Sequence, residues 1–318
     1  MPLPNPRINE SRNNFISRCM EDNQIIEDFD TINQRYAVCN NLYSDRPSQK
    51  QFKLDRKKFR RAYSLGYRKL FKKAATQNNK LTYEYYKKGF RNSIKEFLKS
   101  NDLDGSNYVL FFQNSNTEKM FMDIYTKTSL LFYNWYLDNY KKFIKKLFGT
   151  EQTMQNFINN YVKYSARINQ KITSVQKTAI KNVITIFQSV MQDPDFLKES
   201  MEGKAKILQT KLDGRALWEA RRIVVTETTL AANLGAEKAA LSAFKPEQLL
   251  KDWIQGFSMN HRIGHEILSS QDPIPMTENF INPETGVSMR IPGEGPSSEV
   301  INCSCYVAFI PNPAVFDI

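Results

Sequence analysis

The chain has 318 residues, of which 41% are apolar and 25% charged, and a formal net charge of +12. This composition is typical of a globular protein with about two domains and substantial hydrophobic cores. No apolar run approaches the roughly 20 residues of a membrane-spanning helix, and residues 1–22 lack the apolar stretch of a signal peptide. We therefore expect no membrane partner and folding in the cytosol. Four cysteines in so long a chain do not make a disulfide framework, so reduced thiols or metal thiolates are expected.

The N-terminal region, residues 1–48, predicts a small helical unit followed by a linker. Apolar residues on both sides of residues 22–31 are spaced as the contacts of a mini-core between short helices. The two cysteines of this region are expected to be small apolar contacts within that core. The candidate core residues are Phe15, Ile16, Cys19, Ala37, Val38 and Cys39.

Positive charge is concentrated in residues 51–100. This stretch holds 16 Lys or Arg residues against Asp55, Glu84 and Glu96, so it accounts for nearly all of the net charge. Its aromatic residues recur at helical spacings, which predicts two helices broken near residues 77–79, with the aromatic side toward a core. The cations then form the opposite, solvated side.

This basic side allows three interpretations. It can be an ordinary solvated helix surface, a contact with nucleic acid driven by counterion release, or a docking surface for an acidic protein. The candidate DNA-binding residues are Arg56, Lys57, Lys58, Arg60, Arg61, Arg68, Lys69, Lys72, Lys73, Lys87, Lys88 and Arg91.

Two further stretches complete a helical domain over residues 49–212. Residues 119–148 keep helical spacing up to Gly149, and residues 153–192 keep it up to an Asp-Pro pair. A single helix over 153–192 would be about 60 Å long, which is typical of a coiled coil, a spacer or the centre of a bundle. The fold class predicted is mainly α, with an elongated helical body, and no set of nucleophile, base and acid is visible in this body.

The composition changes near Asp213, and residues 213–318 predict a small α+β module. Asp213 is placed to cap a helix over 214–243, and a second helical signal runs from residue 246 through Trp253. Loop and short-strand patterns rich in Pro, Gly and Asn follow.

Both histidines and two cysteines of this module form a candidate metal site. His261 and His265 have the spacing of neighbours on one helix face, and Cys303 and Cys305 would face the same side of a strand. These four residues suit tetrahedral zinc, either structural or catalytic. They equally fit a metal-free core in which both cysteines are buried and His265 bonds to the loop that Asn302 ends.

The module also carries an ordered set of residues that ends in Asn-Cys-x-Cys after a Pro-Gly turn: Thr226, Glu227, Ala231, Asn233, Gly235, Trp253, Arg262, Gly264, His265, Gln271, Phe280, Gly286, Pro292, Gly293, Asn302, Cys303 and Cys305. Over about residues 213–308, this set resembles the Mu F-like minor head proteins of tailed bacteriophages, also called phage head morphogenesis proteins. Val225 stands where that family usually has arginine, and Ser258 and Asn260 replace an Asp-x-Arg motif. These differences remove charged side chains that would form a polar network in the family. They therefore weaken a catalytic interpretation of this region more than a structural one.

A second resemblance covers residues 15–39, which are similar to a short segment that opens many tailed-phage head and maturation proteins. It implies a docking role for this segment in head assembly.

The resemblance implies a minor structural protein of the virion without enzymatic activity, located in the capsid interior near the portal vertex. The implied partners are the portal or major capsid protein and double-stranded DNA. Two alternatives stay open. One is an enzyme, either a metal-dependent nuclease or hydrolase at the His–Cys cluster or an ADP-ribosyltransferase, although the Glu-x-Glu pair common in such transferases is missing from the module. The other is a zinc-stapled nucleic-acid-binding adaptor with no role in a virion.

Overall fold

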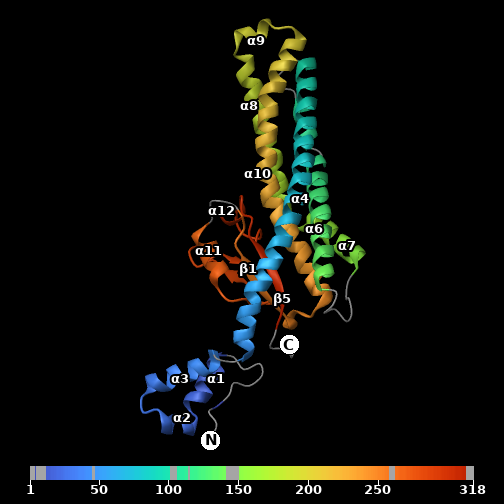
Figure 1. Ribbon diagram of the computed structural model, residues 1–318. Helices are drawn as coiled ribbons and strands as arrows, with labels where there is room; N and C mark the ends of the chain where they lie inside the picture. Colours follow the sequence, from blue (N-terminus) through green and yellow to red (C-terminus); the bar gives the residue numbers. More distant parts are fainter. Residues whose placement is uncertain are drawn as a thin grey trace.

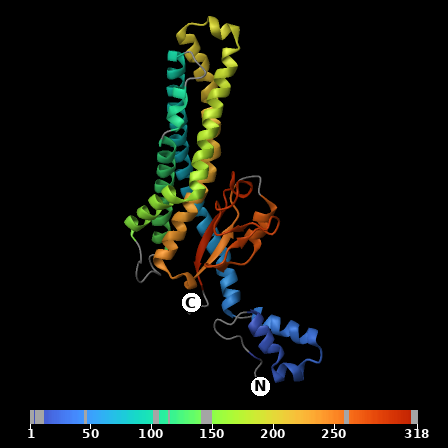
Figure 2. The ribbon, with the colours of Figure 1, turned by 180° about the vertical axis from the view of Figure 1, so that it is seen from behind.

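The computed structural model describes residues 4, 12–44, 47–100, 106–113, 115–140, 150–257 and 262–312. It consists of a long helical body with a small sheet packed on one side (Figures 1 and 2). The predicted fold class, mainly α with a small α+β C-terminal module, is confirmed. In the described part of the chain, no helix has the length and apolar character needed to cross a membrane.

The helices are α1 (Arg12–Met20), α2 (Asn23–Asp28), α3 (Ile32–Ser44), α4 (Pro47–Ser100), α5 (Leu110–Gln113), α6 (Asn116–Tyr140), α7 (Glu151–Tyr164), α8 (Ala166–Met191), α9 (Pro194–Lys198), α10 (Met201–Ala243), α11 (Ile263–Ser270) and α12 (Ser297–Val300), with short 3₁₀ turns at Ser106–Val109 and Pro246–Gln248.

The body is a bundle in which α4, α6, α8 and α10 run side by side (Figures 1 and 2). The aromatic residues of α4 face its core, as predicted; Tyr67, Tyr86, Phe90 and Phe97 are fully buried. The predicted break near residues 77–79 is wrong, because α4 continues through them. Asn78 is buried there and donates to the hydroxyls of Thr128 and Thr228, so a polar residue that suggests a loop is an interior contact.

The prediction of a single helix over residues 153–192 is also wrong. Ser165 has an extended backbone between α7 and α8, and its Oγ accepts from the backbone N–H of Ile168, so it caps α8. Helix α6 covers the first part of the stretch predicted as helical over 119–148; residues 141–149 lie outside the described part of the chain.

Helix α10 begins twelve residues before the predicted cap at Asp213. Ser200 is its N-cap, with Oγ accepting from the backbone N–H of Gly203, and Asp213 lies inside the helix. The helix therefore runs through the predicted domain boundary at residues 212/213. Its N-terminal part belongs to the bundle, and its C-terminal part carries the module.

The module contains a three-stranded antiparallel sheet in the order β2-β1-β5, formed by β1 (Leu249–Ile254), β2 (Ile274–Pro275) and β5 (Tyr306–Pro311). The helix predicted from residue 246 through Trp253 is thus wrong: β1 pairs along its length with β5. Most of β1 is buried, including the charged residues Lys251 and Asp252, so its sequence shows no alternation of apolar and polar residues that would separate strand from helix. A second pair, β3 (Phe280–Ile281) and β4 (Ser288–Met289), lies in the loops between α11 and α12.

Helices α1 to α3 form a separate small unit at the end of the molecule opposite α9 (Figure 1). Its own core contains Phe15, Ile16, Ile25 and the two cysteines, with Val38 partly buried against it. The predicted mini-core is thus confirmed except for Ala37, which is exposed. Cys19 and Cys39, however, form a disulfide, so the expectation of reduced thiols is wrong for this pair. The sequence separates them by 20 residues, and only the return of α3 beside α1 brings them together.

Candidate metal centre and basic surface

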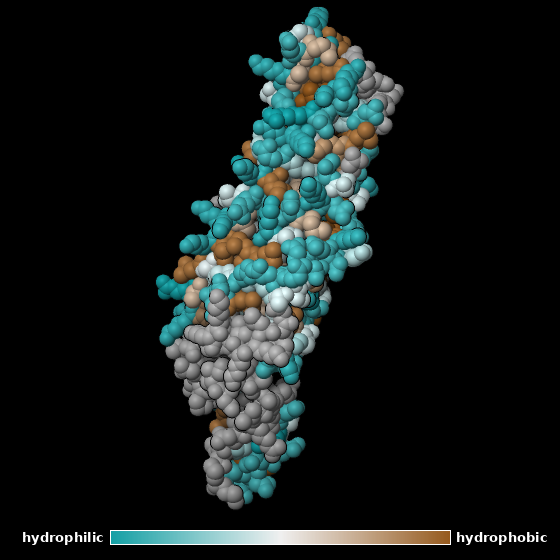
Figure 3. Space-filling model, turned by 90° about the vertical axis from the view of Figure 1, so that its right-hand side faces the viewer, coloured by the Kyte–Doolittle hydropathy of each residue, from teal (hydrophilic) through white to brown (hydrophobic). Residues whose placement is uncertain are grey.

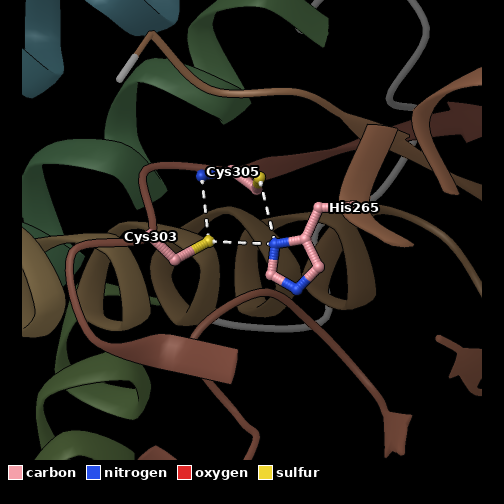
Figure 4. Close-up of side chains that lie close together, drawn as sticks. All are labelled: His265, Cys303 and Cys305. Atoms are coloured by element: carbon pink, nitrogen blue, oxygen red, sulfur yellow. Dashed lines mark hydrogen bonds between the residues drawn. The ribbon is translucent and has the colours of Figure 1, made fainter. Parts of the chain in front are cut away.

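His265, Cys303 and Cys305 meet inside the module. His265 lies in the first turn of α11, and the cysteines flank Ser304 just before β5. The Nδ1 atom of His265 lies 3.6 Å from Cys303 Sγ and 3.7 Å from Cys305 Sγ, and Figure 4 shows both sulfurs beside this ring nitrogen. All three side chains are buried. The predicted meeting of these residues is confirmed, although strand β5 begins only at Tyr306; Ser304 turns away and accepts from the backbone N–H of Phe257.

The fourth predicted ligand, His261, lies outside the described residues. Its neighbour Arg262 is the N-cap residue of α11 and donates to the carbonyl oxygen of Ile301, so it joins the start of this helix to the turn before the cysteines.

Glu299 is a member of this cluster that sequence reasoning missed. Its Oε2 lies 2.9 Å from His265 Nε2, and it also accepts from Asn282 Nδ2 at 3.0 Å, while its Oε1 accepts from the Thr285 hydroxyl at 2.8 Å. Burial opposes ionisation of Glu299, but these hydrogen bonds outweigh it and lower the pKa of the carboxyl group. An ionised carboxylate only accepts, so Nε2 of His265 carries the proton and Nδ1 is the atom presented to the sulfurs.

The two thiols perturb each other. A hydrogen bond between them lowers the pKa of Cys305, while the same bond and burial raise the pKa of Cys303 well above its usual range. Burial opposes protonation of His265, but hydrogen bonds to Cys303 and Glu299 outweigh it and raise its pKa. Cys305 is therefore the more acidic of the two thiols, and both lie beside an imidazole whose orientation Glu299 fixes.

One packing contact fixes the imidazole ring directly, and a second brings Asn282, which bonds to Glu299, close to α11. Trp253 on β1 lies edge-on to it, with ring centroids 5.2 Å apart. Gly264 allows Asn282 to approach the helix, because a Cβ at this position would lie 2.0 Å from Asn282 Oδ1. The tryptophan and glycine of the resemblance thus support the His–Cys cluster rather than a substrate cleft.

The remaining motif residues attach the C-terminal segment to α10. The Thr226 hydroxyl accepts from the backbone N–H of Asn302, and the Thr229 hydroxyl donates to the carbonyl of Cys303 at 2.7 Å. Asn302 has a φ of 56°, a left-handed conformation that asparagine tolerates, and it redirects the chain into the Cys-x-Cys segment. These contacts attach the segment that enters β5 to the helix that carries Glu227.

Pro292 and Gly293 form a tight contact with the same helix. Gly293 has a φ of 95°, and a Cβ there would lie 2.8 Å from the Leu230 side chain, so both backbone conformation and space require glycine. The carbonyl of Pro292 accepts from Asn233 Nδ2 on α10.

Glu227 is buried within the bundle, and its charge is paired with that of a lysine. Its carboxylate accepts from the Tyr125 hydroxyl at 2.8 Å and pairs with Lys171 Nζ at 2.9 Å. It lines a pocket of about 360 Å³ with Arg167 and Arg222, between α8, α10 and the loop before α12. Tyr125 lies on α6 and Lys171 on α8, so Glu227 joins α10 to two other helices of the body.

The predicted DNA-binding residues divide into two groups. Arg56 and Arg60 are half-buried and bind the module: Arg56 forms a two-pronged pair with the buried Asp252, and Arg60 donates to the carbonyls of Trp253 and Ser269. Lys87 is also half-buried. The others are exposed: Lys57, Lys58, Arg61, Arg68, Lys69, Lys72, Lys73, Lys88 and Arg91.

Several exposed cations share one side of α4. Lys58, Arg61, Lys69, Lys72, Lys73, Lys80 and Arg91 have helical spacings that bring them within one broad stripe, which we call the α4 basic stripe. At 1.5 Å per residue, it extends about 50 Å along the helix. One face of the helical body has a mainly hydrophilic surface with scattered hydrophobic patches (Figure 3).

No protein-family model matches the chain, and neither a curated protein nor a solved structure shows significant similarity to it.

Proposed function

We propose that this chain is a minor structural protein of a tailed-bacteriophage head, located in the capsid interior near the portal and in contact with packaged DNA. The α4 basic stripe is the observation that carries the DNA contact. Its cations are exposed and extend over about 50 Å. Three of them, Lys69, Lys72 and Lys73, lie within about one turn of the helix. Such an array attracts a phosphate backbone without reading its sequence.

The placement of the motif residues supports a structural rather than a catalytic role. Thr226, Asn233, Gly293 and Asn302 are occupied in joining the C-terminal segment to α10. The residues that carry the resemblance to phage head proteins therefore have a structural explanation. In the proposed role, the module docks on portal or capsid protein while the helical body extends toward DNA.

The DNA contact predicts a steep loss of affinity with salt. We expect the logarithm of the association constant of duplex DNA to fall linearly with the logarithm of salt concentration. Replacing Lys58, Lys69, Lys72 and Lys73 with Gln should reduce the magnitude of this slope by about 3 to 4, because each lost phosphate contact contributes about 0.9. Fluorescence anisotropy of a labelled duplex over a salt series measures both slopes.

A matched control removes the same charge elsewhere. Lys177 and Lys181 on α8, with Lys206 and Lys211 on α10, are exposed lysines outside the α4 basic stripe. Their replacement with Gln should leave the slope nearly unchanged. Equal slopes for the two quadruple variants, or a flat salt response of the wild-type chain, would remove the DNA contact from the proposal.

A further inference from the structure

The separation of the donor atoms in the His–Cys cluster matches a tetrahedral zinc site. With bonds of about 2.3 Å to sulfur and about 2.1 Å to nitrogen, a nitrogen and a sulfur ligand of tetrahedral zinc lie about 3.6 Å apart. The observed distances from His265 Nδ1 are 3.6 Å to Cys303 Sγ and 3.7 Å to Cys305 Sγ. All three ligand atoms lie within 4.8 Å of one another. The side chains need no large rearrangement to receive the ion.

The atoms behind the ligands are arranged as in histidine–zinc sites. A zinc-bound histidine commonly donates its other ring N–H to a carboxylate, which fixes the tautomer and the ring plane. Glu299 occupies that position at 2.9 Å from Nε2 and is itself held by Asn282 and Thr285. With Nε2 bonded to Glu299, the Nδ1 atom of His265 is directed at the two sulfurs, as Figure 4 shows.

The chemistry of the donors selects the metal. Two sulfurs and one imidazole nitrogen form a soft to borderline set that favours zinc over magnesium or calcium, which prefer oxygen ligands. The three side chains are buried, so the protein would shield an ion bound to them from water. It would join the first turn of α11 to the segment that enters β5.

We propose that His265 Nδ1 and the thiolates of Cys303 and Cys305 bind a zinc ion, with Glu299 as a positioning residue that orients the imidazole. The ion links α11 to the C-terminal segment and stabilises the module. This inference does not depend on the proposed role in a phage head, and its test uses no DNA.

Metal analysis of the purified full-length protein is the first test. Protein produced in zinc-supplemented medium should contain about one zinc per chain, measured by inductively coupled plasma mass spectrometry. After removal of zinc by a chelator, titration with Co²⁺ should produce thiolate-to-cobalt absorption and the visible bands of tetrahedral cobalt. A folded wild-type chain without zinc, and without these bands on cobalt addition, would overturn the proposal and leave a metal-free thiol–imidazole core.

Cysteine variants assign the ligands. Cys303→Ser and Cys305→Ser should each weaken the thiolate-to-cobalt absorption and lower the bound zinc. The double variant Cys19→Ser/Cys39→Ser is the matched control, because it removes the other two cysteines of the chain and should leave metal content and spectrum unchanged. Unchanged zinc and spectrum in both single variants at positions 303 and 305 would contradict the assignment.

Glu299→Gln tests the positioning role without removing a ligand. An amide keeps the shape of the side chain but loses the charge that orients His265, so zinc affinity should fall about 10- to 100-fold in competition with a chromogenic chelator. Tetrahedral cobalt bands should persist at saturating metal. A zinc affinity equal to that of the wild type would show that Glu299 does not orient a metal ligand.

Discussion

Asn233 makes several polar contacts between α10 and the described part of the C-terminal segment. Its Nδ2 group donates to the carbonyls of Pro292 and Cys305, and its Oδ1 accepts from the backbone N–H of Val307 at 3.0 Å. The residue is fully buried. It thus supplies hydrogen-bond partners to three backbone groups at the point where the motif and β5 meet.

Replacing Asn233 with Leu should cost about 3 kcal/mol of unfolding free energy or more, because several buried backbone groups would lose their partners. Leucine has the same number of side-chain heavy atoms and the same branch at Cγ but no polar atoms, so the loss reports mainly on hydrogen bonding. Asn92→Ala, at an exposed position of α4, is the control and should change stability by less than about 0.5 kcal/mol. Chemical denaturation measures both, and equal midpoints for the two variants would contradict this account of Asn233.

Lys251 gives a pH-dependent test. Its side chain is buried on β1, donates to the carbonyl of Arg290 at 3.0 Å and lies 5.1 Å from the Phe280 ring centroid. Burial lowers the pKa of Lys251 to about 8, although Glu237 and Glu294 partly offset this and Arg290 adds to it. Below pH 8 the ammonium group is charged in both folded and unfolded chains, so the cost of burying it is fully present.

As pH rises from about 8 toward 10.5, the folded chain loses this proton before the unfolded chain does. The unfolded state then binds more protons, so stability should rise with pH in this window. Lys251→Met lacks the titrating group, and the stability difference between wild type and this variant should therefore shift in favour of the wild type from pH 7 to pH 10. A difference independent of pH would contradict the lowered pKa.

At this scale, sequence reasoning finds the residues with rare chemistry. Cys303, Cys305 and His265 are conspicuous because cysteine and histidine are scarce in this chain. Glu299 is one of 33 acidic residues, and nothing in its local pattern distinguishes it. Its importance arises only when α12 places it beside His265.

Among the elements, α10 crosses α6 at a very short distance. At Gly235, a Cβ would lie 2.3 Å from the carbonyl oxygen of Ser129 on α6. A backbone oxygen in a helix cannot rotate away. The crossing of α10 and α6 therefore requires glycine at this position.

Two alanine substitutions in α10 should have opposite effects. Gly235→Ala should destabilise the protein by about 2 kcal/mol despite the better helix propensity of alanine, because the added carbon overlaps fixed backbone. Gly214→Ala is the matched control: a Cβ there meets no atom within 4 Å, so it should stabilise the helix by about 0.5 to 1 kcal/mol. Thermal unfolding of both variants tests the crossing, and stabilisation by both would show that the helices are not in contact at Gly235.

The helices were predictable where apolar spacing is regular, and their ends were not. The sequence around Asn78 predicts a loop, but this side chain is a hydrogen-bond donor in the interior. The sequence around Ser165 predicts a continuous helix, but this residue caps α8. Strand β1 is buried on both sides and has no distinguishing period. In each case a tertiary contact decides, and local propensity does not contain it.

At the scale of the whole molecule, the helical body and the module form one connected structure. Tyr67 on α4 stacks on Tyr306 of β5, with ring centroids 4.0 Å apart, and Arg56 pairs with Asp252 on β1. The elongated body and the basic region were predicted from the sequence. The use of Arg56 and Arg60 as internal contacts was not, because a charge pattern does not show which cations have partners within the fold.

Imaging of tailed particles assembled from the genome that encodes this chain tests the central claim most directly. We predict that a reconstruction without imposed symmetry at the portal vertex places the chain in the capsid interior, with the module against portal or capsid protein and the α4 basic stripe facing DNA. Absence of the chain from purified, DNA-filled particles, or a position on their outer surface, would contradict the proposed function.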